Sequence, residues 1–331
     1  MRDGRRRWWA ILPLLVAAVA VAAFAGSATG GQKSHGPPHE ITIAYQPGIG
    51  YAPLIIIKQQ RLIEKHFPRT KVNWRVLASG AAITSGVISG NIQIGAMGVG
   101  PMLVGWSGGV GWRMLTALDD ADLWLMARDR NIRTIADLRG KRIATPAATS
   151  IQAVILRKAA QMRLGDANAL NSSLVSLDHP DGLAALFGGQ IQAHMTSPPF
   201  QFIERERGAH IVARSSTFFG KHTFLGVVAQ QKFYDDHPGF MKRLYQDIQA
   251  SITMLEKKPA QAARILSQDS EGKTTPYGFR RYLASPALDF TTTPHGLMKF
   301  ARFMNDIGQI KKMPSSWKEL VFPTIAKKKG S

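Results

Sequence analysis

The chain has 331 residues, no cysteine and a formal net charge of +20. The lack of cysteine excludes disulfides, thiol nucleophiles, cysteine-ligated metals and a lipid anchor built on cysteine. The basic residues are scattered rather than gathered into a stripe with aromatic residues, so we expect no nucleic-acid partner and interpret the charge as a solvated basic surface.

Residues 1–28 are typical of a signal peptide. Basic residues precede an apolar run from Trp8 to Ala25, and small residues follow through Gly31. An uncleaved anchor is the alternative, because the run approaches the ~20 residues that span a bilayer. We expect cleavage between residues 25 and 28 by a general or twin-arginine route, a flexible tether over residues 29–39, and a periplasmic protein that is not a lipoprotein.

The remaining sequence alternates short apolar runs with loops and amphipathic stretches, which predicts an α/β protein with mostly parallel sheets flanked by helices. The expected strands are Ile41–Tyr45, Val72–Leu77, Ile92–Met97, Arg113–Leu118, Leu123–Ala127, Lys141–Thr145, Ser173–Leu177, Gln192–Thr196, Ile211–Arg214 and Thr223–Ala229. No strand is expected after Ala229, and a helical C-terminal tail is expected from Lys232 onward.

Helices are expected between these strands, and several have readable starts. The expected ranges are Pro53–His66, Ala81–Ser89, Pro101–Gly105, Ile135–Leu138, Ile151–Leu164, Pro180–Phe187 and Pro198–Arg207, followed by five more from Pro238 to Ile325. Proline fits a first helical position, with Ser197 as the cap before Pro198. Thr149 to Gln152 has the spacing of a capping box.

About 300 residues exceed one core, so we predict two lobes. The expected division is residues 40–127 plus 223–331 for lobe 1 and residues 128–222 for lobe 2, with the first five strands in lobe 1. The two crossings, near residues 128–131 and 220–222, would form a hinge beside an interlobe cleft.

Ligands of open parallel sheets bind beyond the carboxyl ends of the strands, where loops enter helix N-termini. Five loops meet this rule: residues 46–51, 79–82, 98–101, 146–150 and 197–200. None contains a charged residue, and all offer small side chains, hydroxyls or backbone N–H groups. Such loops favour an anionic or strongly polar group held by helix N-termini.

Catalytic, metal and cofactor signatures are weak. The histidines form no metal-binding spacing, and His194, on a strand, is interpreted as a core histidine. Asp119, Asp120 and Asp122 are interpreted as a solvated turn near the hinge and Asp178 as a helix cap. There is no nucleophile elbow, dinucleotide fingerprint or phosphate loop. We therefore expect no catalytic residues, no metal and no cofactor.

The sequence also resembles a known family over residues 41–267. The markers are Ile41-Thr42-Ile43-Ala44-Tyr45-Gln46, Lys58-Gln59-Gln60-Arg61-Leu62-Ile63-Glu64, Ser79-Gly80, Gly90-Asn91-Ile92-Gln93-Ile94-Gly95, residues 132–144 from Ile132 to Ala144, Gly189-Gln190-Ile191-Gln192-Ala193 and Phe233-Tyr234-Asp235-Asp236-His237-Pro238. They are similar to the substrate-binding proteins of nitrate, taurine and aliphatic-sulfonate ABC importers, a family that includes relatives binding thiamine pyrimidine precursors.

The resemblance implies a two-lobed, type II-like periplasmic binding protein fold, a monomer that closes on a small-molecule ligand, and delivery to an inner-membrane permease with a cytoplasmic ATPase. By position, the implied ligand-facing residues are Gln46, Ser79, Gly80, Met97, Gly98, Val99, Thr149, Ser150, Ile151, Gln152, Ser197, Pro198 and Phe200, to which the loop analysis adds Tyr51. A sulfonate, taurine or nitrate fits these loops, and so does a neutral heterocycle stacked on Tyr51 or Phe200. Two alternatives remain: an enzyme built on the same fold, and an exported sensor or accessory protein that presents its ligand to a membrane receptor instead of an importer.

Overall fold

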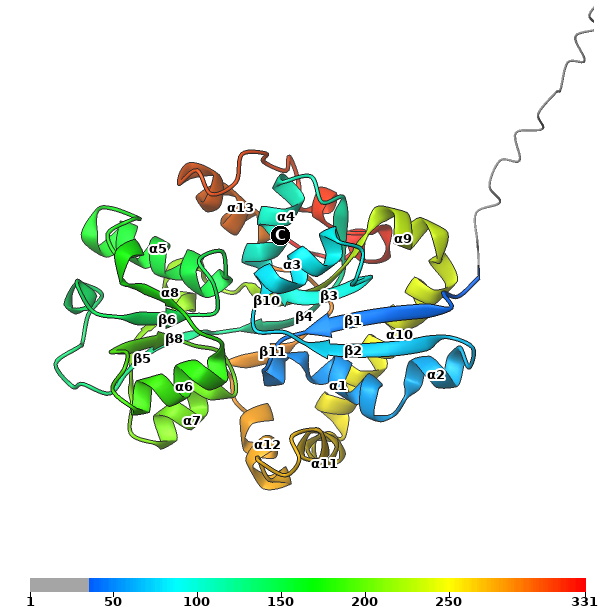
Figure 1. The fold of residues 1–331 in the computed structure, drawn as a ribbon, viewed down its shortest axis with the longest axis horizontal. Coiled ribbons are helices and arrows are strands. Elements are labelled where there is room, and N and C mark those ends of the chain that lie inside the picture. The colour runs from blue at the N-terminus through cyan, green and yellow to red at the C-terminus, as the bar shows by residue number, and fades with distance from the viewer. Residues whose placement is uncertain (1–35) are drawn as a thin grey trace, which may run out of the picture. The chain divides into compact units, whose positions relative to one another are not determined.

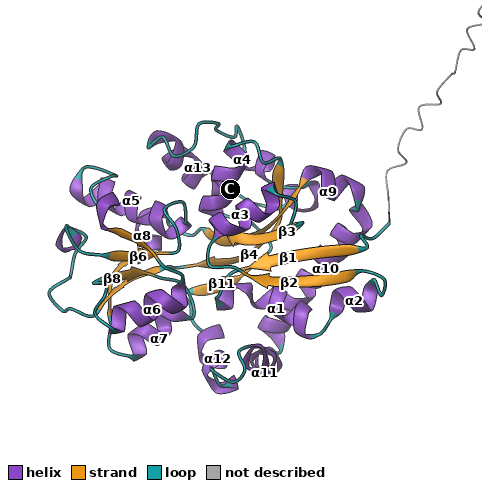
Figure 2. Ribbon diagram, viewed as in Figure 1, coloured by secondary structure: helices purple, strands orange, loops and turns teal. Residues whose placement is uncertain are grey.

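The computed structural model describes residues 36–331. The expected signal peptide and most of the expected tether lie outside these residues. Within them, every strand expected from the sequence is present, and two mixed sheets carry helices on both faces (Figures 1 and 2).

The first sheet has six strands in the order β11-β4-β10-β3-β1-β2. Their bounds are β1 Glu40–Tyr45, β2 Lys71–Val76, β3 Ile94–Gly98, β4 Trp112–Ala121, β10 Thr223–Gln230 and β11 Leu288–Phe290. Strand β1 pairs in parallel with β2 and β3, whereas β10 pairs antiparallel with β3 and β4, and β11 antiparallel with β4. We call the part of the chain built on this sheet lobe 1.

The second sheet has five strands in the order β7-β6-β8-β5-β9 and defines lobe 2. Their bounds are β5 Trp124–Ala127, β6 Ile143–Thr145, β7 Leu174–Ser176, β8 Ala193–Met195 and β9 His210–Arg214. Strand β6 is parallel to β7 and β8, and β5 is antiparallel to β8 and β9.

The two-lobed α/β fold class is confirmed, with three corrections in the strands. The sheets are mixed rather than mostly parallel, because the chain re-enters lobe 1 through β10, which runs against its neighbours. Strand β5 pairs in the second sheet, so the first crossing falls between Ala121 and Trp124, earlier than expected. Strand β11 was not expected after Ala229, because a three-residue strand leaves almost no alternating pattern.

The central strands owe their position to continuous apolar sequence. All residues of β3 are buried, and so are all of β10 except Gln230. A strand that is covered by helices on both faces reads as an unbroken apolar run rather than an alternating one. This packing fixes the ends of β1 and β3, from which the cleft loops leave.

Helices connect the strands, and those whose N-termini face the cleft begin shortly after a strand ends. The helices of the first half are α1 Ala52–Gln59, α2 Leu62–His66, α3 Gly80–Ile88, α4 Val99–Ser107, α5 Ile151–Leu164, α6 His179–Phe187, α7 Phe200–Glu206 and α8 Ser215–Phe219, with short 3-10 turns at Ile49–Tyr51, Ala136–Leu138 and Asn171–Ser173. The C-terminal elements are α9 Gln231–Asp236, α10 Pro238–Lys257, α11 Pro259–Asp269, α12 Pro276–Leu283, α13 Leu297–Asp306, the 3-10 turn Trp317–Leu320 and α14 Pro323–Ala326.

Three expectations about the helices and their caps were wrong. The range 53–66 forms two helices, because Arg61 takes a left-handed conformation with φ 52°. Helix α7 begins at Phe200 with Pro199 as its cap residue, so Ser197 caps nothing. The capping box is absent, since Ser150 rather than Thr149 caps α5 and Gln152 contacts His179 instead.

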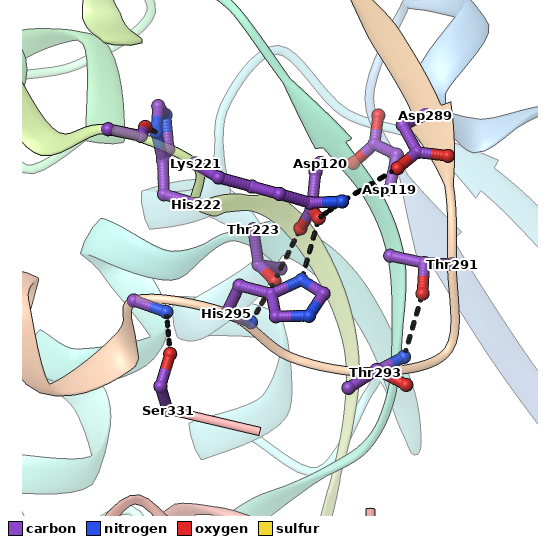
Figure 3. Close-up of polar contacts among 12 residues, drawn as sticks. Asp119, Asp120, Lys221, His222, Thr223, Asp289, Thr291, Thr293, His295 and Ser331 are labelled. Carbon is purple, nitrogen blue, oxygen red and sulfur yellow. Dashed lines mark hydrogen bonds and ion pairs between the residues drawn. The ribbon is translucent and has the colours of Figure 1, made fainter. Parts of the chain in front are cut away.

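The second crossing is held by charged side chains from three segments (Figure 3). Thr223 Oγ1 donates to Asp120 Oδ1 over 3.1 Å, and His295 Nδ1 lies 2.6 Å from Asp120 Oδ2. Lys221 Nζ lies 3.4 Å from Asp120 and 2.9 Å from Asp289. The end of β4, the start of β10 and the segment after β11 are therefore tied together where the chain returns to lobe 1.

Asp119 and Asp120 are not a solvated turn. Both belong to β4 and are buried. Asp119 accepts a 3.0 Å hydrogen bond from the Leu225 N–H, but burial dominates and raises the pKa of its carboxyl well above the usual range. A short acidic run looks like a turn from sequence, and only strand pairing with β10 shows that it lies inside the sheet.

Asp122, in the first crossing, contacts the end of β9 and the start of α8. Its Oδ1 accepts from the Ser216 N–H at 3.0 Å, and its Oδ2 lies 3.0 Å from Arg214 Nη1 and 3.2 Å from Trp124 Nε1. Burial opposes the ionised form, but hydrogen bonds from Ser216, Arg214 and Trp124 outweigh it and lower the pKa of Asp122. The carboxylate thus pins the start of β5 to the end of β9.

Candidate functional site

A small cavity lies between the lobes, with a volume of about 20 Å³. Its lining comes from both lobes: Gln46, Pro47, Tyr51, Gly80, Gly98, Pro101 and Phe224 from lobe 1, and Ser150, Ile151, Gln152, His179 and Ser197 from lobe 2. A space of this size admits about one water molecule, which needs ~10–15 Å³. An organic solute therefore requires the lobes to separate.

The cavity sits where parallel strands end and helices begin. Gln46 follows β1, Gly98 ends β3, Ser150 follows β6 and Ser197 follows β8. The N-termini of α3, α4, α5 and α6 contribute Gly80, Gly98, Ile151 and His179 to the lining. Four positive ends of helix dipoles thus converge on one space, which favours a negatively charged or oxygen-rich group.

One of these helix starts keeps its backbone donors available. The side chains of Ser79, Ser150 and Asp178 accept the N–H of the third residue after them in α3, α5 and α6. The cap residue of α4 is Gly98, which has no side chain to do so. The first N–H groups of α4 therefore need another acceptor, and a bound solute can supply it.

The polar side chains of the lining are uncharged. Gln46 Nε2 donates to Tyr51 Oη over 2.6 Å, and burial raises the pKa of Tyr51 well above its usual range. Ser150 and Ser197 add hydroxyls. No Asp, Glu, Lys or Arg among residues 36–331 lines this cavity. Any solute charge would meet dipoles and hydrogen bonds rather than a countercharge.

A buried chain of side chains leads from the cavity into lobe 2. Gln152 Nε2 lies 3.1 Å from His179 Nε2, and His179 Nδ1 lies 3.1 Å from His194 Nε2. His194 Nδ1 lies 2.6 Å from Glu204 Oε1. Burial lowers the pKa of His194 to about 3 and raises the pKa of Glu204 to about 9, so the contact joins neutral groups and is not an ion pair at neutral pH.

The lobes meet closely beside the cavity, at two glycines of α4 and its cap. A Cβ on Gly100 would lie 2.8 Å from the Thr149 carbonyl and 2.9 Å from the Ile151 N–H. A Cβ on Gly98 would lie 3.0 Å from the Ile151 side chain. These positions let α4 of lobe 1 approach the start of α5 in lobe 2.

The structure brings together some of the residues singled out from sequence. Gln46, Tyr51, Gly80, Gly98, Ser150, Ile151, Gln152 and Ser197 line the cavity. Ser79, Met97, Val99, Thr149, Pro198 and Phe200 do not. Met97 and Val99 point into the core, Ser79 caps α3, and Phe200 stacks on His179 at 5.6 Å between ring centroids.

Sequence analysis missed His179 and Phe224, and it placed Pro47 and Pro101 in cleft loops without naming them as ligand-facing. His179 had a readable signal, because it directly follows Asp178, which the sequence marked as a cap and which caps α6 in the structure. A residue at the first position of a helix that follows a strand points toward the same edge as the other cleft loops.

The cavity at the hinge lacks this setting. It has a volume of about 190 Å³ and lies among Asp120, Asp122, Lys221, His222 and Asp289. It is not at the carboxyl ends of parallel strands, and its charged groups already pair with one another. Within residues 36–331 there is no cluster of His, Cys, Asp or Glu fit for a metal ion.

The two mixed sheets form the two-lobed fold of periplasmic binding proteins. A family model, the NMT1-like family, matches residues 34–270, and the chain belongs to that family. None of the helices within residues 36–331 has both the length and the apolar character of a membrane span.

Curated relatives agree with this assignment. The chain is 28% identical over 131 residues to a putative aliphatic sulfonates-binding protein of Escherichia coli, which covers 38% of this chain and 40% of that protein. It is 26% identical over 230 residues to the taurine-binding periplasmic protein of the same organism, covering 69% and 67% of the two chains. The first match thus spans about two fifths of that relative.

A solved structure extends the likeness to nearly the whole fold. The alkanesulfonate-binding protein SsuA from Xanthomonas axonopodis pv. citri, bound to MOPS, superposes with a TM-score of 0.69 and 22% identity. The match covers 84% of this chain and 95% of that one. At this identity it shows a shared fold.

Proposed function

We propose that the chain is the solute-binding component of an ABC importer and that the interlobe cavity holds a small anionic or polar organic solute of the sulfonate, taurine or nitrate kind. The observation that carries this proposal is the convergence of four helix N-termini on a cavity lined by uncharged polar groups. Relatives that bind sulfonates and taurine support it.

The mechanism is closure of two lobes on the solute. The solute binds first to lobe 1, at Gln46, Gly80 and the start of α4. Closure of lobe 2 then adds the Ser150 and Ser197 hydroxyls and the Gln152 amide. Because a ligand shifts open and closed populations only by its differential affinity, the contacts from lobe 2 stabilise the closed form that the permease recognises.

A neutral heterocycle is the second candidate solute. Tyr51 lines the cavity, whereas Phe200 is engaged with His179. A pyrimidine would therefore stack on Tyr51 and use Gln46 or Gln152 for hydrogen bonds to its edge.

Thermal unfolding in the presence of candidate solutes separates these proposals. Purified protein lacking residues 1–28 would be screened with taurine, alkanesulfonates, nitrate and aminopyrimidines. A solute at a concentration of 100 times its Kd stabilises the native state by about 2.7 kcal/mol and raises Tm. A shift with a sulfonate supports the first proposal, a shift with a pyrimidine alone supports the second, and no shift with any of them contradicts both.

Two further measurements test whether the protein returns its solute unchanged and where in the cell it is located. After incubation, a binding protein returns its solute unchanged, whereas an enzyme yields product, which chromatography detects. Fractionation of cells that express the full chain should place a monomer in the periplasm, shortened by about 25–28 residues as expected for a signal peptide. Recovery of the full-length chain in membranes would contradict the cleaved, exported form.

A further inference from the structure

The buried chain from Gln152 to Glu204 can run its hydrogen bonds in two directions. In the first, the Gln152 amide donates to His179 Nε2, His179 Nδ1–H donates to His194 Nε2, and His194 Nδ1–H donates to Glu204 Oε1. Gln152 then turns its carbonyl oxygen away from His179. The terminal acceptor in this direction is Glu204.

In the second direction every donor and acceptor exchanges roles. Protonated Glu204 donates from Oε1 to His194 Nδ1, His194 Nε2–H donates to His179 Nδ1, and His179 Nε2–H donates to the Gln152 carbonyl oxygen after a half-turn of the amide. The histidines switch from the Nδ1–H to the Nε2–H tautomer. Gln152 then turns its N–H₂ group away from His179.

The surroundings of Glu204 decide between the two. Its side chain is fully buried, it faces no Lys or Arg in any ion pair of the described residues, and its Oε2 has no hydrogen-bond partner. The titratable groups along the chain are His179 and His194, with Asp178 acting on His194 at a distance. A carboxylate here would be a buried charge with one hydrogen bond, which is costly, so the acid keeps its proton.

The position of that proton follows from the contacts. On Oε2 it would be a buried O–H without an acceptor, whereas on Oε1 it lies 2.6 Å from His194 Nδ1. Gly182 leaves the room that His194 needs, because a Cβ there would lie 2.6 Å from His194 Nε2. The second direction therefore satisfies the chain at neutral pH.

We propose that Glu204, acting through His194 and His179, is a positioning residue that turns the N–H₂ group of Gln152 toward the cleft, so that lobe 2 offers a donor to oxygen atoms of the solute. Gln152 lines the cavity, so the expected effect on solute binding rests on the proposed function. The arrangement of protons along the chain does not. It explains how a cleft without Lys or Arg gains a further donor for an oxyanion.

Ionisation of Glu204 reverses the chain with a balanced movement of protons. The Glu204 proton passes to His194 Nδ1, the His194 Nε2 proton passes to His179 Nδ1, and the His179 Nε2 proton leaves through the cleft. The Gln152 amide turns, and its oxygen faces the solute. The carbonyl oxygen of Gln152 then faces the oxygen atoms of the solute, and their repulsion weakens binding of an oxyanion.

Histidine tautomers give a readout that does not require a ligand. In ¹⁵N-labelled protein, two-bond proton–nitrogen spectra at pH 7 should show Nε2–H tautomers for both His179 and His194, and Nδ1–H tautomers above the pKa of Glu204, at pH 10. Nδ1–H tautomers at pH 7 would overturn the proposal.

Variants at position 204 separate the positioning role from packing. Glu204→Gln cannot ionise, so its histidine tautomers should be the same at both pH values, whereas those of the wild type switch. Glu204→Leu removes the donor and should lose the fixed tautomer at pH 7. Unchanged tautomers in Glu204→Leu would contradict the proposal; if that variant does not fold, the comparison of wild type with Glu204→Gln decides it.

Calorimetric titration with ethanesulfonate tests the ligand consequence. We expect affinity to fall about tenfold from pH 7 to pH 10 in the wild type, the size of one hydrogen bond to a charged group. In Glu204→Gln the affinity should fall less than twofold between the same pH values. This variant therefore controls for any loss of affinity that comes from deprotonation of lysine side chains. An equal fall in both proteins would contradict the ligand consequence. Failure of ethanesulfonate to bind at pH 7 would count against the proposed function, while the tautomers would still decide the inference.

Discussion

The backbone N–H of Ile49 in lobe 1 donates a 3.2 Å hydrogen bond to the carbonyl of Pro198 in lobe 2. This bond crosses the cleft beside the cavity, where Gly48 also comes close to Pro198. Together with the small volume between the lobes, it describes a closed arrangement. Entry of a solute requires this contact to break, and closure re-forms it.

Gly100→Ala should hold the lobes apart. The added Cβ would meet the Thr149 carbonyl and the Ile151 N–H at under 3 Å, and both are backbone atoms that cannot rotate away. We expect the affinity for the solute identified by thermal unfolding to fall about tenfold or more, since closure brings in the lining residues that lobe 2 contributes. Small-angle scattering should show a larger radius of gyration with solute present.

Gly239→Ala is the matched control, because no atom lies within 4 Å of its new Cβ in the first turn of α10. Its affinity should equal that of the wild type. Equal affinities for Gly100→Ala and Gly239→Ala would contradict closure against α4.

Ser150→Gly should weaken solute binding by about 1–3 kcal/mol, the cost of leaving a buried hydrogen-bonding partner unpaired. Glycine is chosen rather than alanine, because it replaces a serine cap at a cost of only a few tenths of a kcal/mol. Isothermal titration measures the change. Ser79→Gly removes the cap of α3, which lies outside the cavity lining, and should leave affinity unchanged. Similar losses in the two variants would remove Ser150 from the site.

Glu204→Gln should become increasingly more stable than the wild type as pH rises from 6.5 to 8.5. Burial raises the pKa of Glu204 to about 9 in the folded state from 4.5, so across this window the folded wild type holds a proton that the unfolded chain has already released. Stability of the wild type therefore falls as pH rises, by up to about 1.4 kcal/mol per pH unit from this group. His194, with its pKa lowered to about 3, contributes below pH 6.5 and with the opposite sign.

Urea unfolding at several pH values measures this difference. Glu206→Gln, on the same helix and half exposed beside Arg281, is the control and should follow the wild-type pH profile. A pH-independent difference between Glu204→Gln and wild type would show that Glu204 is ionised throughout.

Asp122→Asn should destabilise the fold by about 1–3 kcal/mol at pH 7, because the amide cannot accept from Ser216, Arg214 and Trp124 at once. The pKa of Asp122 is lowered in the folded state, so its contribution is present above the unfolded value of 3.8 and is lost as pH falls through the folded pKa. The two proteins should therefore converge in acid. Asp289→Asn breaks only an exposed pair with Lys221 and should cost under about 1 kcal/mol at pH 7.

Much of the fold could be predicted because the apolar runs are long and regularly separated. Every strand from β1 to β10 was expected near its observed bounds, and so was α5 over Ile151–Leu164. The lobe boundaries were a weaker inference, because β5 is a short, wholly apolar strand and nothing in its composition says which sheet it joins. Pairing with β8 and β9 decides that, and pairing is a property of distant segments.

The candidate site was partly readable for the same reason. Loops at the ends of strands could be identified, and with them Gln46, Gly98, Ser150 and Ser197. Which residue of each loop faces the cavity could not be read, because it depends on backbone geometry over one or two residues. Met97 and Val99 flank Gly98 yet point into the core.

The sequence by itself determined the class of the fold, the uncharged character of the cleft loops and His194 as a core histidine, because these follow from apolar periodicity and residue type. Only the tertiary structure decided the mixed sheets, the link that Asp122 makes between the start of β5 and the end of β9, and the chain from Gln152 through His179 and His194 to Glu204. Those features join residues from separate elements. Their energies come from burial and from distances that exist only once the two sheets have folded.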